Sequence, residues 1–227
     1  MKYPYLLFDA DDTLFDFPAA SSRAFSIMCE KNDIPNTDTV YQLYHEINAV
    51  LWKAFDRGEV SKSFVTYERY IRFLAALQLD RNAEKCNLDY LSALGEVVFP
   101  LPHAEDVCRT LASRGHHLYI ITNAVASVQR SRLKHCTFGN LFEGAFISED
   151  AGASKPDPAY YHYVQTHIPE ISPENTLIIG DSLATDIKGA NNAGIPCCWF
   201  NPKSQSPPAN LSIDYEIKDL RELLNLV

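Results

Sequence analysis

Three carboxylates and a hydroxyl follow the first apolar stretch of this chain of 227 residues. Tyr5 to Phe8 are consecutive apolar or aromatic residues, which is typical of a strand buried on both faces. Asp9, Asp11, Asp12 and Thr13 come directly afterwards, and burying such carboxylates is costly unless a positive group neutralises them. A motif of this form also arises by chance. It indicates either an acidic surface turn or a strand end that carries a nucleophile and a metal.

Further polar side chains come at the ends of later apolar stretches that are predicted to be strands. They are Thr122 and Asn123 after the strand at 118–121, Asp181 after the strand at 177–179, Asp186 one turn into the following helix, and Lys155 on the loop before Pro156. In an open parallel sheet, ligands bind outside the carboxyl ends of the strands. We therefore expect these side chains to converge.

The chemistry that such a site favours follows from its charge. Carboxylates from Asp9, Asp11 and Asp181 would repel one another unless a cation joined them, and an open set of hard oxygens suits Mg²⁺. The Thr122 hydroxyl, nearby backbone N–H groups and the Lys155 ammonium could hold phosphate oxygens. One carboxylate could attack phosphorus while a second handles the proton of the leaving group.

Each of these residues also has a structural interpretation. Asp181 fits a helix start, while Asp186 and Lys155 fit a solvated surface. Their occurrence in order at four strand-end or loop positions favours the phosphate site. Asp12 receives no chemical role and is expected to serve the turn that follows the first strand.

Helical periodicity dominates the eighty residues after the acidic motif. The predicted helices are 19–31, 37–57, one that begins after Ser61 or Ser63 and buries a stripe of Phe64, Tyr67, Tyr70, Ile71, Leu74 and Leu77, and 87–98. Four amphipathic helices with short connections indicate a helical bundle. The aromatic residues of these helices could line a ligand pocket, but such a stripe is more often the core of the bundle.

From Pro100 onward, short apolar strands alternate with helices. The predicted order is helix 103–114, strand 117–122, helix 125–135, strand 145–147, helix 156–167, strand 176–180, helix 185–192, strand 196–200, and a last strand and helix after the Pro-rich loop 202–208. Such alternation is typical of an α/β fold with a doubly wound, Rossmann-like parallel sheet. We expect residues 1–15 and 99–227 to form this core and residues 16–98 to form an inserted α-helical domain.

Composition limits the partners and the cellular location. The formal charge of −9 argues against binding to a nucleic-acid polymer, which needs a basic face. The six cysteines include no C-x-x-C pair, which favours reduced, buried thiols. Neither a signal peptide nor an apolar run of membrane-spanning length is present, so we expect a cytoplasmic protein without a membrane partner.

The four motifs together resemble those of the haloacid dehalogenase (HAD) superfamily of phosphatases with a helical cap. They are DADDT at 9–13, ITN at 121–123, KPDP at 155–158 and GDSLATD at 180–186. The resemblance implies that Asp9 is a nucleophile forming an aspartyl-phosphate, and that Asp11 is the general acid and base. The metal residues would be Asp9, Asp11 (through its backbone carbonyl), Asp181 and the supporting Asp186. Thr122 and Lys155 would be catalytic residues that also bind the substrate phosphate, and Asn123 would be a further substrate-binding residue.

A narrower resemblance concerns the segments FDADDTLFDF, LWKAF, PLPHA and ITNAVASVQRSRL. They are similar to those of the bacterial house-cleaning 5′-nucleotidases, which implies pyrimidine nucleoside monophosphates as substrates. Ala124 stands where such relatives usually carry glycine, and it would be strained if the backbone there required a positive φ. Selectivity is expected from cap aromatics, with Trp52, Phe55 and Tyr67 as candidates for stacking on a base.

The function expected is therefore a Mg²⁺-dependent phosphomonoester hydrolase acting on a small phosphorylated metabolite, in particular a nucleoside 5′-monophosphate. One alternative is a phosphatase or phosphomutase for another small metabolite, such as a sugar phosphate or phosphoglycolate. Another is a catalytically idle binding or regulatory protein on the same scaffold. A dehalogenase is disfavoured by Asp11 and a transporter ATPase by the lack of membrane helices. The sequence does not indicate the oligomeric state.

Overall fold

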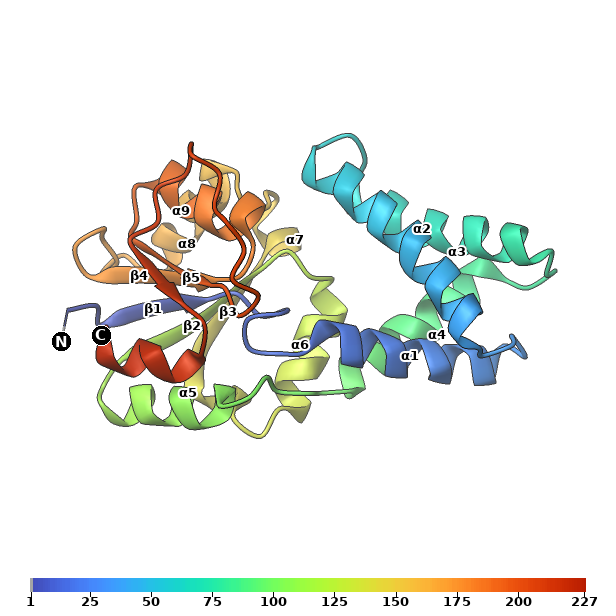
Figure 1. Ribbon diagram of the computed structural model, residues 1–227, viewed down its shortest axis with the longest axis horizontal. Coiled ribbons are helices and arrows are strands. Elements are labelled where there is room, and N and C mark those ends of the chain that lie inside the picture. The colour runs from blue at the N-terminus through green and yellow to red at the C-terminus, as the bar shows by residue number, and fades with distance from the viewer. Residues whose placement is uncertain (1) are drawn as a thin grey trace. The chain divides into compact units, whose positions relative to one another are not determined.

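The computed structural model describes residues 2–227, which form two compact units. The core unit comprises the residues up to Phe17 together with Val98–Val227, and the helical unit comprises Pro18–Val97 (Figure 1). Each unit has its own buried interior.

Two short linkers join the helical unit to the core unit, and they are hydrogen-bonded to each other. The N–H of Asp16 donates to the carbonyl of Phe99 over 2.8 Å, and the N–H of Leu101 donates to the carbonyl of Leu14 over 2.8 Å. Phe15 also pairs with Pro100 in an antiparallel bridge. The chain thus leaves and rejoins the core unit through neighbouring segments.

The core unit is built on a six-stranded sheet with the order β3-β2-β1-β4-β5-β6, in which all five neighbouring pairs are parallel. The strands are β1 (Tyr5–Phe8), β2 (His117–Thr122), β3 (Phe142–Ile147), β4 (Thr176–Gly180), β5 (Cys197–Phe200) and β6 (Tyr215–Ile217). Phe8 at the end of the central β1 pairs with Ile120 of β2 and Ile179 of β4. The residues that follow these three strands therefore meet at one edge. This arrangement confirms the predicted α/β doubly wound sheet.

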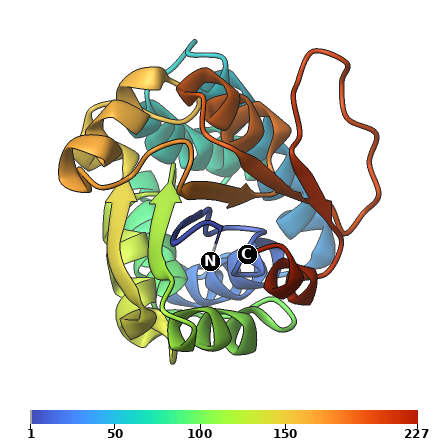
Figure 2. The ribbon, with the colours of Figure 1, turned by 90° about the vertical axis from the view of Figure 1, so that its left-hand side faces the viewer.

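Helices cover both faces of the sheet (Figure 2). On one face lie α5 (Ala104–Ser113) and the 3₁₀ helix η3 (Leu220–Asn225), and on the other lie α8 (Pro158–His167) and α9 (Lys188–Ala193). Successive side chains of a strand point to opposite faces, so Leu6 and Phe8 join the first apolar cluster and Leu7 joins the second. The remaining elements of this unit are α6 (Ala126–His135), η1 (Gly139–Leu141), α7 (Ser148–Ala151) and η2 (Leu183–Ile187).

The helical unit consists of α1 (Phe17–Lys31), which starts in the linker, α2 (Asp38–Asp56), α3 (Lys62–Leu77) and α4 (Ala83–Glu96). Aromatic side chains fill its interior, namely Phe25, Tyr44, Tyr70, Phe73 and Tyr90. The stripe predicted for α3 is partly wrong. Tyr70 and Leu74 are buried, but Phe64 and Tyr67 are 41% and 51% exposed, because the buried face of α3 instead includes Val65, Arg69 and Phe73.

Several element boundaries also differ from those predicted. The fourth helix begins at Ala83 rather than at residue 87, because the Asn82 side chain accepts the Lys85 N–H and caps it there. The helix predicted at 185–192 begins earlier, as the π-helical turn η2, where the Ser182 hydroxyl accepts the Thr185 N–H. Strand β3 begins three residues earlier than residue 145. The strands predicted at 117–122 and 176–180 have those bounds.

The cysteines and the helix lengths also bear on the sequence-based expectations. All six cysteine thiols are buried and unpaired. Within residues 2–227, no helix combines the length and the apolar character that crossing a membrane would require.

Candidate active site

Asp9 directly follows the central strand. Its backbone N–H donates to the carbonyl of Ile179 over 2.8 Å, so the ladder between β1 and β4 extends to this residue and fixes its position. Its side chain is almost fully buried. A carboxylate in this position requires compensation by positive charge or by hydrogen-bond donors.

Lys155 supplies that compensation. Its ammonium nitrogen lies 2.6 Å from Oδ1 of Asp9, 2.6 Å from Oδ1 of Asp186 and 2.9 Å from the carbonyl oxygen of Ile121. An ammonium group has three N–H donors, so all three are used. Burial acts to lower the pKa of Lys155, but the attraction of Asp186 and Asp9 outweighs it and raises that pKa well above its ordinary value. The side chain therefore stays charged.

Asn123 holds the loop that carries Lys155. Its Oδ1 accepts the Lys155 backbone N–H over 2.9 Å, and its Nδ2 donates to the Lys155 carbonyl over 2.9 Å. Both ends of the side-chain amide are thus engaged with the backbone of one residue. Asn123 was predicted to bind substrate, and in this structure its side chain positions Lys155.

Thr122 ends strand β2 as predicted and is almost fully buried. Its hydroxyl accepts the N–H of Ala124 over 3.0 Å, and its own N–H donates to the Tyr160 hydroxyl over 3.0 Å. Ala124 is not among the described residues with a positive φ. The strain that glycine would relieve there is therefore absent.

Asp181 and Asp186 follow β4 and complete an acidic cluster with Asp9. Oδ2 of Asp186 accepts the Ser182 N–H over 3.0 Å. Asp181 is fixed at two points, because Thr13 donates from its hydroxyl to Oδ1 over 3.2 Å and the Trp199 indole N–H donates to the Asp181 carbonyl over 2.9 Å. The contacts of Thr13 and Trp199 were not predicted.

Gly180 gives Asp186 room to approach the end of β4. A Cβ atom at position 180 would lie 2.4 Å from the Cγ of Asp186, which is far inside van der Waals contact. Only glycine fits at this position without displacing the carboxylate.

The acidic cluster has the chemistry of a divalent-cation site. One oxygen each from Asp9, Asp181 and Asp186 lie within 4.8 Å of one another. Burial raises the pKa of Asp9 well above its ordinary value, and burial together with the charge of Asp186 raises the pKa of Asp181 to about 7. Three carboxylates beside one ammonium leave two uncompensated negative charges. A hard cation such as Mg²⁺ fits this set of oxygens and this charge.

Asp11 was predicted to join these residues, but its carboxylate lies apart from the acidic cluster. It forms an ion pair with Arg132 of α6, a residue that the sequence-based interpretation did not assign. Val128, Gln129 and Arg132 are all buried and share one face of α6, so their three- and four-residue spacing was available as a signal. An arginine is seldom fully buried, and a polar position on such a face is easily taken for surface.

Asp12 has the expected turn role. Its φ is 61°, a conformation that Asp tolerates better than most residues. Its Oδ1 accepts the Phe17 N–H at the start of α1 over 3.2 Å. The residue therefore turns the chain away from β1.

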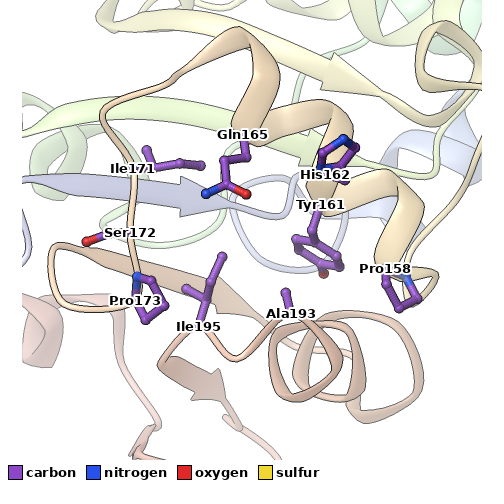
Figure 3. A pocket seen from close by; sticks show the side chains of 9 residues that line it. All are labelled: Pro158, Tyr161, His162, Gln165, Ile171, Ser172, Pro173, Ala193 and Ile195. Carbon is purple, nitrogen blue, oxygen red and sulfur yellow. The ribbon is translucent and has the colours of Figure 1, made fainter.

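A pocket of about 200 Å³ lies on the α8 side of the core unit (Figure 3). Its lining residues are Pro158, Tyr161, His162, Gln165, Ile171, Ser172, Pro173, Ala193 and Ile195. None of these residues belongs to the acidic cluster or to the Lys155 contacts, so the pocket is distinct from the candidate active site.

Comparisons with known proteins identify a matching family and similar chains. The family model of haloacid dehalogenase-like hydrolases matches residues 6–200. The chain is 36% identical to the HAD-hydrolase YfnB of Bacillus subtilis, over 100% of this chain and 96% of that protein. A crystal structure of YfnB bound to magnesium, which reveals interdomain movement in that protein, is also similar. The TM-score is 0.92, and the alignment covers 100% of this chain and 99% of the YfnB chain.

Two further relatives carry the name pyrimidine 5′-nucleotidase. PynA of Streptococcus pneumoniae is 32% identical, over 99% of this chain and 95% of that protein. YjjG of Escherichia coli is 27% identical, over 100% of this chain and 99% of that protein.

Proposed function

The chain belongs to the haloacid dehalogenase-like hydrolases, as its motifs indicated, and we propose that it is a Mg²⁺-dependent phosphatase of nucleoside 5′-monophosphates. The observation that carries the proposal is the buried contact of Asp9 with Lys155, beside the carboxylates of Asp181 and Asp186. This contact supports Asp9 as the nucleophile, because it holds one buried carboxylate at the carboxyl end of the central strand β1.

In the proposed reaction, a carboxylate oxygen of Asp9 attacks phosphorus and the bond from phosphorus to the ester oxygen breaks. Asp11 gives a proton to that oxygen, and the alcohol leaves. Asp11 then takes a proton from a water molecule whose oxygen attacks the phosphorus of the aspartyl-phosphate. The bond from Asp9 to phosphorus breaks, and inorganic phosphate is released.

Mg²⁺ held by Asp9 and Asp181, with Asp186 supporting and the Asp11 carbonyl as an expected further ligand, would supply positive charge that keeps Asp9 ionised and offsets the charge of the phosphate. Lys155 neutralises Asp9 and Asp186 from the other side. Because its three N–H donors are engaged, it must exchange one contact to donate to a phosphate oxygen.

Thr122 is the second proposed phosphate contact. Its hydroxyl accepts from Ala124 and keeps its own proton available for donation. Asn123 contributes by fixing the backbone of Lys155. In this proposal Thr122 binds the phosphate and Asn123 positions Lys155.

The names of PynA and YjjG support nucleoside monophosphates as the substrate class. The test is phosphate release from a panel of CMP, UMP, dTMP, AMP, GMP, ribose 5-phosphate and phosphoglycolate, with Mg²⁺ and with EDTA. We expect the pyrimidine nucleotides to have the highest kcat/KM and EDTA to abolish turnover. A flat response across nucleotides would remove the nucleotidase assignment, and transfer of the phosphoryl group to a second hydroxyl of the sugar would indicate a mutase.

Asp9→Asn tests covalent catalysis through this residue. The substitution keeps the shape of the side chain, so we expect an intact fold and a kcat at least about 10³-fold lower. Asp12→Asn is the matched control, because it changes a carboxylate three residues away while preserving the oxygen that accepts the Phe17 N–H. Near-wild-type turnover in Asp9→Asn would refute the proposed mechanism.

A further inference from the structure

Arg132 is a buried arginine in the core unit for which the proposed chemistry has no role. Its side chain is 1% exposed, and its Nη1 donates to Oδ1 of Asp11. The only other partner within residues 2–227 is the Gln129 Oε1, at a long 3.4 Å. Nε and Nη2 of Arg132 are buried without a hydrogen-bond partner in that part of the chain. A buried charge is costly unless it is paired, so Asp11 is the group that compensates it.

The guanidinium is held in a fixed place by its surroundings. Its central carbon lies 5.5 Å from the centre of the Phe15 ring, and that ring stacks on Phe138 with centres 5.9 Å apart. Both phenylalanines are buried in the main apolar cluster of the core unit. Arg132 is therefore an anchored cation.

Asp11 differs from its partner in exposure, since its side chain is 28% exposed. Only Oδ1 is engaged by Arg132, and within residues 2–227 no donor is seen for Oδ2. The pair thus joins a buried, closely packed cation to a carboxylate with one oxygen still available. A proton-transfer group needs this combination of a defined orientation and a free oxygen.

We propose that Arg132 is a positioning residue that orients Asp11 for proton transfer to and from the reacting oxygens. The inference rests on the proposed function, in which Asp11 gives a proton to the leaving oxygen and later takes one from water. Arg132 keeps its own protons throughout. Its contribution is to hold Oδ1 and to leave Oδ2 available for proton transfer.

A purely structural ion pair would have different consequences from a positioning contact. Loss of a structural contact weakens the fold and lowers kcat/KM by a similar factor for every substrate. Loss of orientation at Asp11 matters only where the leaving oxygen needs a proton. The nitrophenolate ion leaves without one, whereas a benzyl alkoxide does not.

The experiment compares p-nitrophenyl phosphate with benzyl phosphate, which are similar in size but differ in the basicity of the leaving group. In Arg132→Gln we expect kcat/KM for benzyl phosphate to fall by roughly 10²-fold, in the range of general acid catalysis. The fall for p-nitrophenyl phosphate should be at most a few-fold, with little change in KM. Arg132→Lys should restore part of the loss.

Arg130→Gln is the matched control. Arg130 lies on the same helix, is exposed and pairs with Asp150, so its substitution should leave both substrates within about twofold. An equal loss for both substrates in Arg132→Gln, accompanied by a lower Tm, would show a structural pair and overturn the inference.

Where Arg132→Gln does not fold, Arg132→Lys in the wild-type and Asp11→Asn backgrounds decides the question. Asp11→Asn should itself discriminate against benzyl phosphate, and Arg132→Lys should add nothing further in that background. Independent losses that multiply would refute the inference. A wild-type enzyme inactive with Mg²⁺ on the nucleotides and on both esters would refute the proposed function and the inference together. An enzyme active on the esters with unaffected Arg132 variants would refute the inference alone.

Discussion

The ammonium nitrogen of Lys155 lies 2.6 Å from Oδ1 of Asp9, although 146 residues separate them in the sequence. The same nitrogen lies 2.6 Å from Oδ1 of Asp186. One buried cation therefore compensates two buried carboxylates, one directly after β1 and one in η2, which follows the neighbouring strand β4. We therefore expect both the stability of the fold and the catalytic activity to depend on the Lys155 ammonium.

Lys155→Ala removes this cation and leaves both carboxylates without it. Breaking a buried ion pair by removing one partner costs about 3–5 kcal/mol, so we expect the free energy of unfolding to fall by that amount, with a lower kcat and a higher KM. Urea unfolding and steady-state kinetics measure these changes. Lys188→Ala, at an exposed position of α9, should change neither. Wild-type stability and kinetics in Lys155→Ala would show that the contact is unimportant.

Gly180→Ala should displace Asp186. The added Cβ would lie 2.4 Å from the carboxylate carbon, and such overpacking typically costs about 1–3 kcal/mol, so stability and Mg²⁺ affinity should both fall. Gly144→Ala is the control within the same sheet, since its Cβ would lie 3.4 Å from the nearest atom, in the Tyr119 ring. Equal behaviour of the two variants would argue against a steric role for Gly180.

Mg²⁺ should stabilise the folded protein independently of turnover. A ligand at 100 times its Kd adds about 2.7 kcal/mol to the free energy of unfolding, which is measurable as a rise in Tm that EDTA reverses. Asp181→Asn should lose most of this rise, because it removes one charge from the acidic cluster, whereas Asp12→Asn should retain it. An undiminished rise in Asp181→Asn would place the cation elsewhere.

His116 should make stability depend on pH. Its ring is buried, its Nδ1 donates to the Tyr3 carbonyl over 2.8 Å, and burial lowers its pKa below the ordinary value of 6.5. The unfolded chain then binds a proton more readily than the folded protein. The stabilisation is thus complete above about pH 6.5 and is lost as the pH falls toward the lower pKa of the folded state.

Urea unfolding between pH 5 and 8 checks this prediction. The decline of stability below about pH 6.5 should be shallower in His116→Asn than in the wild type. His45→Asn, at an exposed position of α2, should keep the wild-type slope. A His116→Asn variant with the full wild-type slope would exclude this residue as the source.

The sequence predicted the sheet well where strands are short apolar runs bounded by turns. The strands at 117–122 and 176–180 have the predicted bounds. Both are apolar runs because the sheet is covered on both faces, so that residues such as Ile121 and Ile178 are buried. Parallel strands also share one edge for their carboxyl ends. The meeting of Asp9 with Asp181 could therefore be anticipated, while the chemical role of each remains a prediction.

Other features depend on tertiary contacts that periodicity does not report. Phe64 and Tyr67 lie at the right spacing for burial but are exposed, since the orientation of α3 is set by its packing partners. Arg132 looks like a surface residue until Asp11 is placed beside it. The engagement of Asn123 by the Lys155 backbone is likewise invisible in a linear motif.

The two linkers between the units have a consequence for how this architecture diversifies. Asp16 and Leu101 tie the outgoing and returning segments together at one point of the core, so the points where the insertion begins and ends are neighbours. An insertion with adjacent ends can be lengthened, replaced or deleted without rethreading the sheet. Evolution can therefore change the helical unit while the acidic cluster of the core unit stays the same.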